Sequence, residues 1–68
     1  MPSSVIRSAD YDAARNELSI TFVSGKVYVY QLVPRQVHEA FRAAPSKGTF
    51  FNQHIRDRYP FREIISSN

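Results

Sequence analysis

The chain has 68 residues and no cysteine, so neither a disulfide nor a thiolate metal site can stabilise it or take part in chemistry. It also lacks any apolar run close to the roughly 20 residues that cross a bilayer, and residues 1–4 lack the basic and apolar parts of a secretory signal. These absences predict a soluble cytoplasmic protein without membrane partners. The short length predicts a single domain over residues 4–65, with frayed tails at residues 1–3 and 66–68.

Charge is unevenly distributed along the chain. Acidic and basic residues balance as far as Val33, so the net charge of +3 lies entirely in the second half. From Pro34 onward the basic residues are Arg35, Arg42, Lys47, Arg56, Arg58 and Arg62, and the acidic residues are Glu39, Asp57 and Glu63. A basic half can attract phosphate groups at low salt. A net charge of this size is also what ordinary solubility favours, so both interpretations stay open.

The first half of the chain predicts three antiparallel strands joined by short turns. At the first turn, Asp12 can accept hydrogen bonds from nearby backbone N–H groups and Asn16 tolerates a left-handed conformation. Apolar and polar residues alternate most clearly in the second strand, as in a strand with one buried face. The predicted strands are residues 4–11, 17–23 and 26–32.

The turn between the second and third strands decides where Tyr28 and Tyr30 point. A two-residue loop would place both rings on the polar face of the sheet. A three-residue loop that ends at Gly25 pairs Ile20 with Tyr28 and Leu18 with Tyr30, which turns the rings toward the apolar face. Glycine fits the third position of a type I turn followed by a bulge, so we expect the longer loop, with the tyrosines leaning into the core and their hydroxyls at its rim.

The second half of the chain predicts two amphipathic helices. Pro34 suits the start of the first helix and Pro45 ends it, while Ser46 caps the second helix and Pro60 ends that one. The apolar positions are Val37, Ala40, Phe41 and Ala44 in the first helix, and Phe51, Ile55 and Tyr59 in the second. After Pro60, we expect Phe61, Ile64 and Ile65 to form a short extended cover. The predicted fold is therefore α+β, a three-stranded antiparallel meander followed by two helices packed on one face.

Three motifs in this order resemble the KTSC domain. They are Tyr-Val-Tyr at residues 28–30, Val-Pro at 33–34, and the run from Ser46 to Tyr59 with the pattern SKGxFFNxxIRxxY. The family is named for its occurrence at the C-terminus of some lysyl-tRNA synthetases and also occurs as stand-alone bacterial proteins. The resemblance covers about residues 4–61. It implies a small uncharacterised domain for which RNA binding has been proposed.

A candidate anion site lies at the predicted start of the second helix. The unpaired N–H groups of a helix N-terminus attract phosphate, and Ser46, Lys47 and Gly48 would lie there. Asn52 and Arg56 follow Gly48 at helical spacing and would share its face. The simpler alternative is that Ser46 only caps the helix, Gly48 only avoids a clash with the sheet, and Asn52 bonds a loop carbonyl.

Further candidate contacts for nucleic acid are Arg58, and Tyr28 and Tyr30 if their rings are exposed. Arg56 and Arg58 could equally complement the carbonyl end of the second helix. His38 and His54 lie on different helices without a carboxylate pair, so we expect no metal, no cofactor and no catalytic residue. The chain is therefore expected to be a binding module for RNA or another polyanion, and not an enzyme.

The alternative function is a protein-interaction accessory that binds a larger protein partner. Its contact surface would be the sheet face that the helices leave uncovered. The residues on that face are Ser19, Thr21, Val23, Val27 and Val29.

Overall fold

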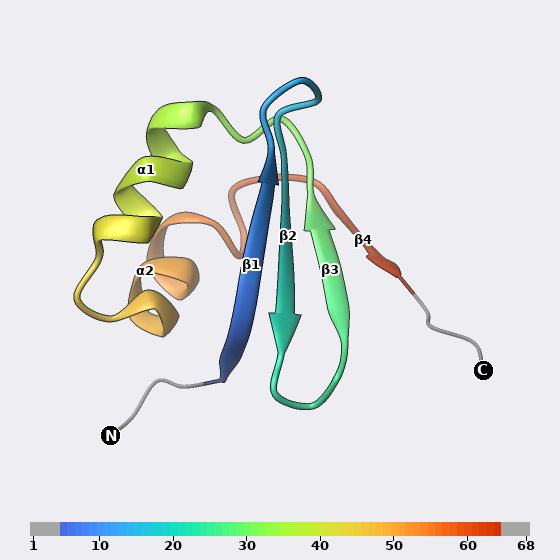
Figure 1. Cartoon of the computed structure of the whole chain (residues 1–68), viewed down its shortest axis with the longest axis vertical. Coiled ribbons are helices and arrows are strands. Elements are labelled where there is room, and N and C mark those ends of the chain that lie inside the picture. Colours follow the sequence, from blue (N-terminus) through green and yellow to red (C-terminus); the bar gives the residue numbers. More distant parts are fainter. Residues whose placement is uncertain (1–4, 65–68) are drawn as a thin grey trace.

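The computed structural model describes residues 5–64, so the predicted domain limits at residues 4 and 65 and the predicted tails lie outside the described residues. The described chain forms a sheet with two helices beside it (Figure 1). In chain order the elements are β1 (Ile6–Asp12), β2 (Glu17–Phe22), β3 (Val27–Tyr30), α1 (Arg35–Ala43), α2 (Lys47–His54) and β4 (Phe61–Ile64). The predicted α+β class is confirmed. Neither helix in this range is long and apolar enough to span a membrane.

The sheet has four strands in the order β1-β2-β3-β4, with every neighbouring pair antiparallel. The prediction of three strands is therefore wrong, because residues 61–64 pair with β3 instead of only covering the core. Tyr30 lies opposite Phe61, and the Gln31 N–H donates to the Pro60 carbonyl oxygen at 2.8 Å. Without β4, the outer edge of β3 would leave a row of N–H and C=O groups unpaired.

The turn between β1 and β2 has the predicted chemistry. Asp12 Oδ1 accepts hydrogen bonds from the N–H groups of Ala14 at 3.0 Å and Arg15 at 3.3 Å. Asn16 has a φ of 56°, in the left-handed region that asparagine tolerates. The turn is therefore built by the two residues that the sequence analysis selected.

The β2–β3 hairpin has the register of the three-residue loop. The Cα partners are Leu18 with Tyr30, Ser19 with Val29, Ile20 with Tyr28 and Thr21 with Val27. Gly25 has a φ of 96°, and its N–H donates to the Phe22 carbonyl oxygen at 2.8 Å. The Phe22 N–H in turn donates to the Lys26 carbonyl oxygen at 2.9 Å. The predicted pairing is confirmed, and it places both tyrosines on the face that carries the core.

The connection from β3 to α1 is fastened to the first turn by hydrogen bonds. The Val33 N–H donates to the Asn16 carbonyl oxygen at 2.8 Å, and the Tyr11 hydroxyl donates to the Val33 carbonyl oxygen at 2.7 Å. Val33 itself is fully buried. These bonds fix the start of α1 against the end of β1.

Helix α1 packs with a slightly different face from the predicted one. Phe41 is buried and Val37 is half-buried as expected, but Ala40 is exposed. His38, which is not among the predicted apolar positions, stacks on Tyr11 with ring centroids 4.4 Å apart and an interplanar angle of 13°. The helix is therefore turned toward β1, because the flat Tyr11–His38 contact replaces the small contact that Ala40 would make.

Helix α2 ends at His54, earlier than the predicted end near Pro60. The N–H groups of Ile55 and Arg56 both donate to the Phe51 carbonyl oxygen, at 3.0 Å and 2.9 Å, which closes the last turn. Ile55 is fully buried and Tyr59 is half-buried, so the predicted apolar row still faces inward. Arg56 and Arg58 follow the helix. The interpretation of these arginines as cations within its last turn is therefore wrong.

The core lies between the helices and one face of the sheet, here called the inner face. Its buried members are Leu18, Ile20, Tyr30, Val33, Phe41, Phe51 and Ile55. Figure 1 shows α1 and α2 beside β1, with β4 at the opposite edge of the sheet. Two short helices thus cover the inner face incompletely. Near β4 the face stays partly open, since Tyr28 is only half-buried and Phe61 is 51% exposed.

Candidate functional site

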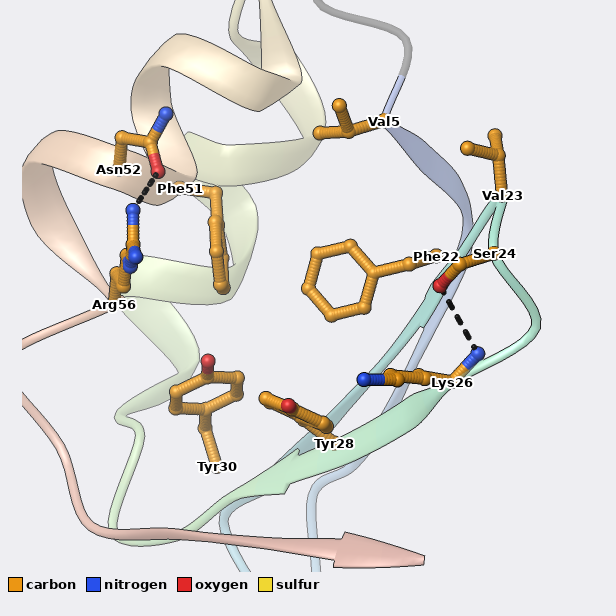
Figure 2. A pocket seen from close by; sticks show the side chains of 10 residues that line it. All are labelled: Val5, Phe22, Val23, Ser24, Lys26, Tyr28, Tyr30, Phe51, Asn52 and Arg56. Atoms are coloured by element: carbon orange, nitrogen blue, oxygen red, sulfur yellow. Dashed lines mark hydrogen bonds between the residues drawn. The ribbon is translucent and has the colours of Figure 1, made fainter. Parts of the chain in front are cut away.

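A pocket of about 440 Å³ opens on the inner face, between the β2–β3 hairpin and α2 (Figure 2). We call it the hairpin pocket. It is lined by Val5, Phe22, Val23, Ser24, Lys26, Tyr28, Tyr30, Phe51, Asn52 and Arg56. The volume is within the range of about 300–1,000 Å³ that is usual for small-molecule sites. Four of the eight candidate residues from the sequence therefore line one pocket: Tyr28, Tyr30, Asn52 and Arg56.

Four aromatic rings make up the apolar part of the hairpin pocket. Phe22 contacts Tyr28 edge to face with ring centroids 5.5 Å apart, and it contacts Phe51 in the same way at 5.6 Å. Tyr30 contacts Phe51 at 5.4 Å with an interplanar angle of 78°. Each ring is thus held by at least one other, so the wall of the pocket is preformed.

One face of the Tyr28 ring is already occupied. Phe61 of β4 stacks on it with ring centroids 5.2 Å apart and an interplanar angle of 13°. A planar ligand can therefore stack on the other face of Tyr28 only. Tyr30 offers no stacking surface, since it is 1% exposed, so its predicted role in stacking does not fit the structure.

Tyr30 contributes its hydroxyl to the hairpin pocket, although the side chain as a whole is buried. Figure 2 shows the hydroxyl directed toward Arg56 and Phe51. Among residues 5–64, no side chain or backbone group forms a hydrogen bond with this hydroxyl. Since no buried side-chain oxygen of this range lacks a partner, the hydroxyl is open to the pocket. Burial, reinforced by the neighbouring Tyr28, raises the pKa of Tyr30 to about 12, although Arg56 lowers the pKa in part. At neutral pH the hydroxyl therefore keeps its proton and can donate it to a ligand.

Two cations flank the aromatic wall. Arg56 Nη1 donates to Asn52 Oδ1 at 3.4 Å, which holds the guanidinium beside the pocket and leaves its other N–H groups available. Lys26 reaches in from the hairpin, opposite the side of Arg56 (Figure 2). No aspartate or glutamate is among the lining residues, although Asp57 is near enough to raise the pKa of Tyr30 slightly. The lining is therefore aromatic and positively charged.

The other four candidate residues lie elsewhere. Ser46 Oγ accepts a hydrogen bond from the Thr49 N–H at 3.3 Å, so Ser46 caps α2 as expected. Lys47 Nζ donates to the Arg42 carbonyl oxygen at 3.1 Å, which ties this lysine to the end of α1. Gly48 is buried. The start of α2 is thus engaged in contacts within the protein, and it is separate from the hairpin pocket.

Lys47 and Arg58 line two further pockets. The Lys47 pocket, of about 420 Å³, lies between β1 and α1 and includes Arg7, Asp10 and His38. The Arg58 pocket, of about 590 Å³, lies between the two helices. Burial lowers the pKa of His38, and Arg42 lowers it further, so His38 is held neutral. Within the described range, no three His, Asp or Glu side chains are placed to share a metal ion.

The outer face of the sheet differs from the predicted protein-contact surface. Val29 is only 3% exposed, so it cannot contribute to a contact as expected. Ser19, Thr21 and Val27 are half-buried, and Val23 is exposed but lines the hairpin pocket. Beside them, Arg62 forms an ion pair with Glu17 at 4.0 Å. The face is therefore smaller and more polar than the sequence indicated.

Lys26 is a charged lining residue of the hairpin pocket that was not among the candidates from the sequence. The signal was present in the hairpin register, because a three-residue loop places Lys26 opposite Phe22 and therefore on the inner face. Phe51 was expected only in the apolar row of the second helix, and Phe22 was not among the candidates. They also form the wall of the pocket, because the two helices are too short to cover them completely.

Comparison with known proteins gives consistent matches. The model of the KTSC domain matches residues 2–59. A lysine–tRNA ligase of Nostoc punctiforme is 41% identical over 61 residues. A small protein of Tsukamurella paurometabola is 39% identical over 57 residues, and this match covers 84% of this chain and 85% of that protein. The match to the ligase covers 90% of this chain but only 11% of the ligase. The crystal structure of a KTSC domain protein from Yersinia pestis has a TM-score of 0.88 and 38% identity, covering 94% of this chain and 90% of that one.

Proposed function

This chain belongs to the KTSC domain family, and we propose that it is a small binding module for single-stranded RNA that uses the hairpin pocket. The observation that carries the proposal is the combination of aromatic rings, two cations and no lining carboxylate in one preformed pocket. Proteins bind single strands through aromatic side chains that stack on bases and through cations that follow the phosphates. A duplex keeps its bases stacked internally, so it would gain little from this pocket.

The relatives support RNA as the ligand. Three of them are lysine–tRNA ligases, and in each the match to this chain covers 11% of the ligase. A domain of this size that is part of a tRNA ligase would often be close to RNA. This chain covers 85% of the small relative from Tsukamurella paurometabola, so a related domain also occurs without a ligase in the same chain.

The expected affinity follows from the few contacts that the pocket can provide. Stacking of one base contributes roughly 1–3 kcal/mol. Two phosphate contacts, by Lys26 and Arg56, would give a slope of log K against log salt of about −1.4 for a single strand. Raising the salt from about 50 mM to about 200 mM should then weaken binding about sevenfold.

Fluorescence anisotropy with a labelled single-stranded RNA hexamer tests the proposal. Arg56→Ala should weaken binding and reduce the salt slope to about −0.7, because one phosphate contact is lost. Arg58→Ala is the matched control, since Arg58 is also exposed and follows α2 but lines a different pocket. Equal effects of both variants would mean that binding follows net charge and not the hairpin pocket. No binding at low salt would remove the proposal.

The alternative function, contact with a larger protein through the outer face, predicts a different outcome. Val27→Asp would then abolish association with that partner while leaving RNA binding unchanged. Such a contact should also persist at high salt, because it would depend on apolar area. The buried state of Val29 reduces that area and makes this function the less supported one.

A further inference from the structure

We propose that the hairpin pocket takes one unstacked nucleotide of the strand, with the base against the aromatic wall and its 5′-phosphate held by Arg56 and the Tyr30 hydroxyl. This inference rests on the proposed function and specifies the ligand chemistry of the same site. It predicts that a 5′-mononucleotide alone is sufficient to bind.

The Tyr30 hydroxyl is the feature of the pocket that most directly indicates a ligand with a hydrogen-bond acceptor. It belongs to a side chain that is 1% exposed, it is directed toward Arg56, and it forms no hydrogen bond with residues 5–64. No side-chain oxygen in this range is both buried and unpartnered, so the hydroxyl itself still reaches the space of the pocket. A hydroxyl that faces a pocket without a partner in the protein is free to donate its hydrogen bond to a ligand there. A phosphate oxygen would accept its proton while also pairing with the neighbouring guanidinium.

The opposite part of the pocket suits a nucleobase. Phe61 holds the Tyr28 ring from one side, so this ring of the pocket wall is fixed in place and loses little freedom when a base packs against it. Phe22 stands nearly perpendicular to Tyr28, at an interplanar angle of 75°, and bounds that space from the side. A bare phosphate would make no use of this wall.

The charges place the two ends of the ligand. Arg56 and Asn52 lie on the same side as the Tyr30 hydroxyl, whereas Lys26 comes from the hairpin (Figure 2). The phosphate that precedes the base therefore fits at Arg56, and Lys26 is positioned for the next phosphate of a longer strand. An acidic peptide would satisfy the cations but would leave the aromatic wall without a planar partner.

Two-dimensional ¹H–¹⁵N NMR of the full chain with 5′-CMP, cytidine and inorganic phosphate as separate probes tests the inference. We expect 5′-CMP to shift the signals of Lys26, Tyr28 and Arg56, and to bind at least tenfold more tightly than either fragment. Binding of phosphate as tight as that of 5′-CMP would overturn the inference, as would shifts caused only by an aspartate-rich peptide.

Tyr30→Phe tests the hydroxyl separately from the fold. It should weaken 5′-CMP binding roughly tenfold, the usual effect of losing a hydrogen bond to a charged group, and leave cytidine binding unchanged. A purely structural role of Tyr30 would weaken both probes equally and would overturn the assignment. Tyr59→Phe, at a half-buried tyrosine in another pocket, is the matched control.

The result also separates this inference from the proposed function. If the RNA hexamer binds with the expected dependence on Arg56 but 5′-CMP produces no shifts, the single-nucleotide site is wrong and the RNA function stands. If neither ligand binds, both are wrong.

Discussion

Alkaline pH should destabilise the folded protein through Tyr30. The folded pKa is raised from 10.0 to about 12, mainly because the side chain is buried. The unfolded chain therefore releases this proton at lower pH than the folded chain does. The stabilisation from the neutral hydroxyl is fully present below pH 10 and is lost as the pH rises toward 12.

The size of the effect follows from the two pKa values. Each pKa unit corresponds to about 1.4 kcal/mol, so the complete loss is about 3 kcal/mol. At about pH 11, midway through the window, linkage gives a loss of about 1.4 kcal/mol. This is a substantial part of the total stability of a small domain, which is usually about 5–15 kcal/mol.

Urea unfolding of the wild type and of Tyr30→Phe at pH 8 and pH 11 measures this effect. Other groups also titrate above pH 9, so the relevant quantity is the difference between the two proteins. We expect the wild type to lose about 1.4 kcal/mol more than Tyr30→Phe between these pH values. Equal losses in both proteins would refute the argument that the surroundings of Tyr30 in the folded protein keep its hydroxyl neutral.

Three further perturbations test other parts of the structure. Leu32→Asn should raise the free energy of unfolding in urea by about 1 kcal/mol, because Leu32 has a φ of 63°, a conformation that asparagine adopts with less strain. The Leu32 side chain is 71% exposed, so little apolar burial is lost with it. Thermal stability should fall as the pH drops below 6.5. Burial and Arg42 lower the pKa of His38 in the folded protein, so the unfolded chain binds the proton more readily there. His38→Phe should reduce the fall in thermal stability. Phe61→Ala should weaken binding of 5′-CMP by about 0.5–1.5 kcal/mol, measured by NMR titration, because Tyr28 loses the ring that fixes it. In each case an unchanged value would contradict the stated cause.

Local sequence chemistry was sufficient to predict the turns and the hairpin register in the first half of the chain. Asp12 and Asn16 specify the first turn through side-chain bonds and a left-handed φ, and Gly25 specifies the length of the second. Because side chains alternate along a strand, the loop length alone fixes which face carries Tyr28 and Tyr30. The burial of Tyr30 was therefore predictable from a single glycine.

The second half depends more on tertiary contacts, and the sequence analysis was less accurate there. The position of β4 follows from the open edge of β3, which no local pattern in residues 61–64 reveals. The early end of α2 similarly depends on the packing of Ile55 under the sheet. The early end of α2 takes Arg56 off the helix face that it was expected to share with Gly48, and Arg56 lines the hairpin pocket instead.

The candidate site follows from a mismatch between the two halves. A four-stranded sheet offers more apolar inner face than two short helices placed beside β1 can cover, and the excess carries Phe22 and Tyr28. A domain that only needed stability would gain from burying these rings fully. Here Lys26 and Arg56 stand at the border of the uncovered area instead, an arrangement that suits the aromatic and anionic parts of the nucleotide that we propose as the ligand.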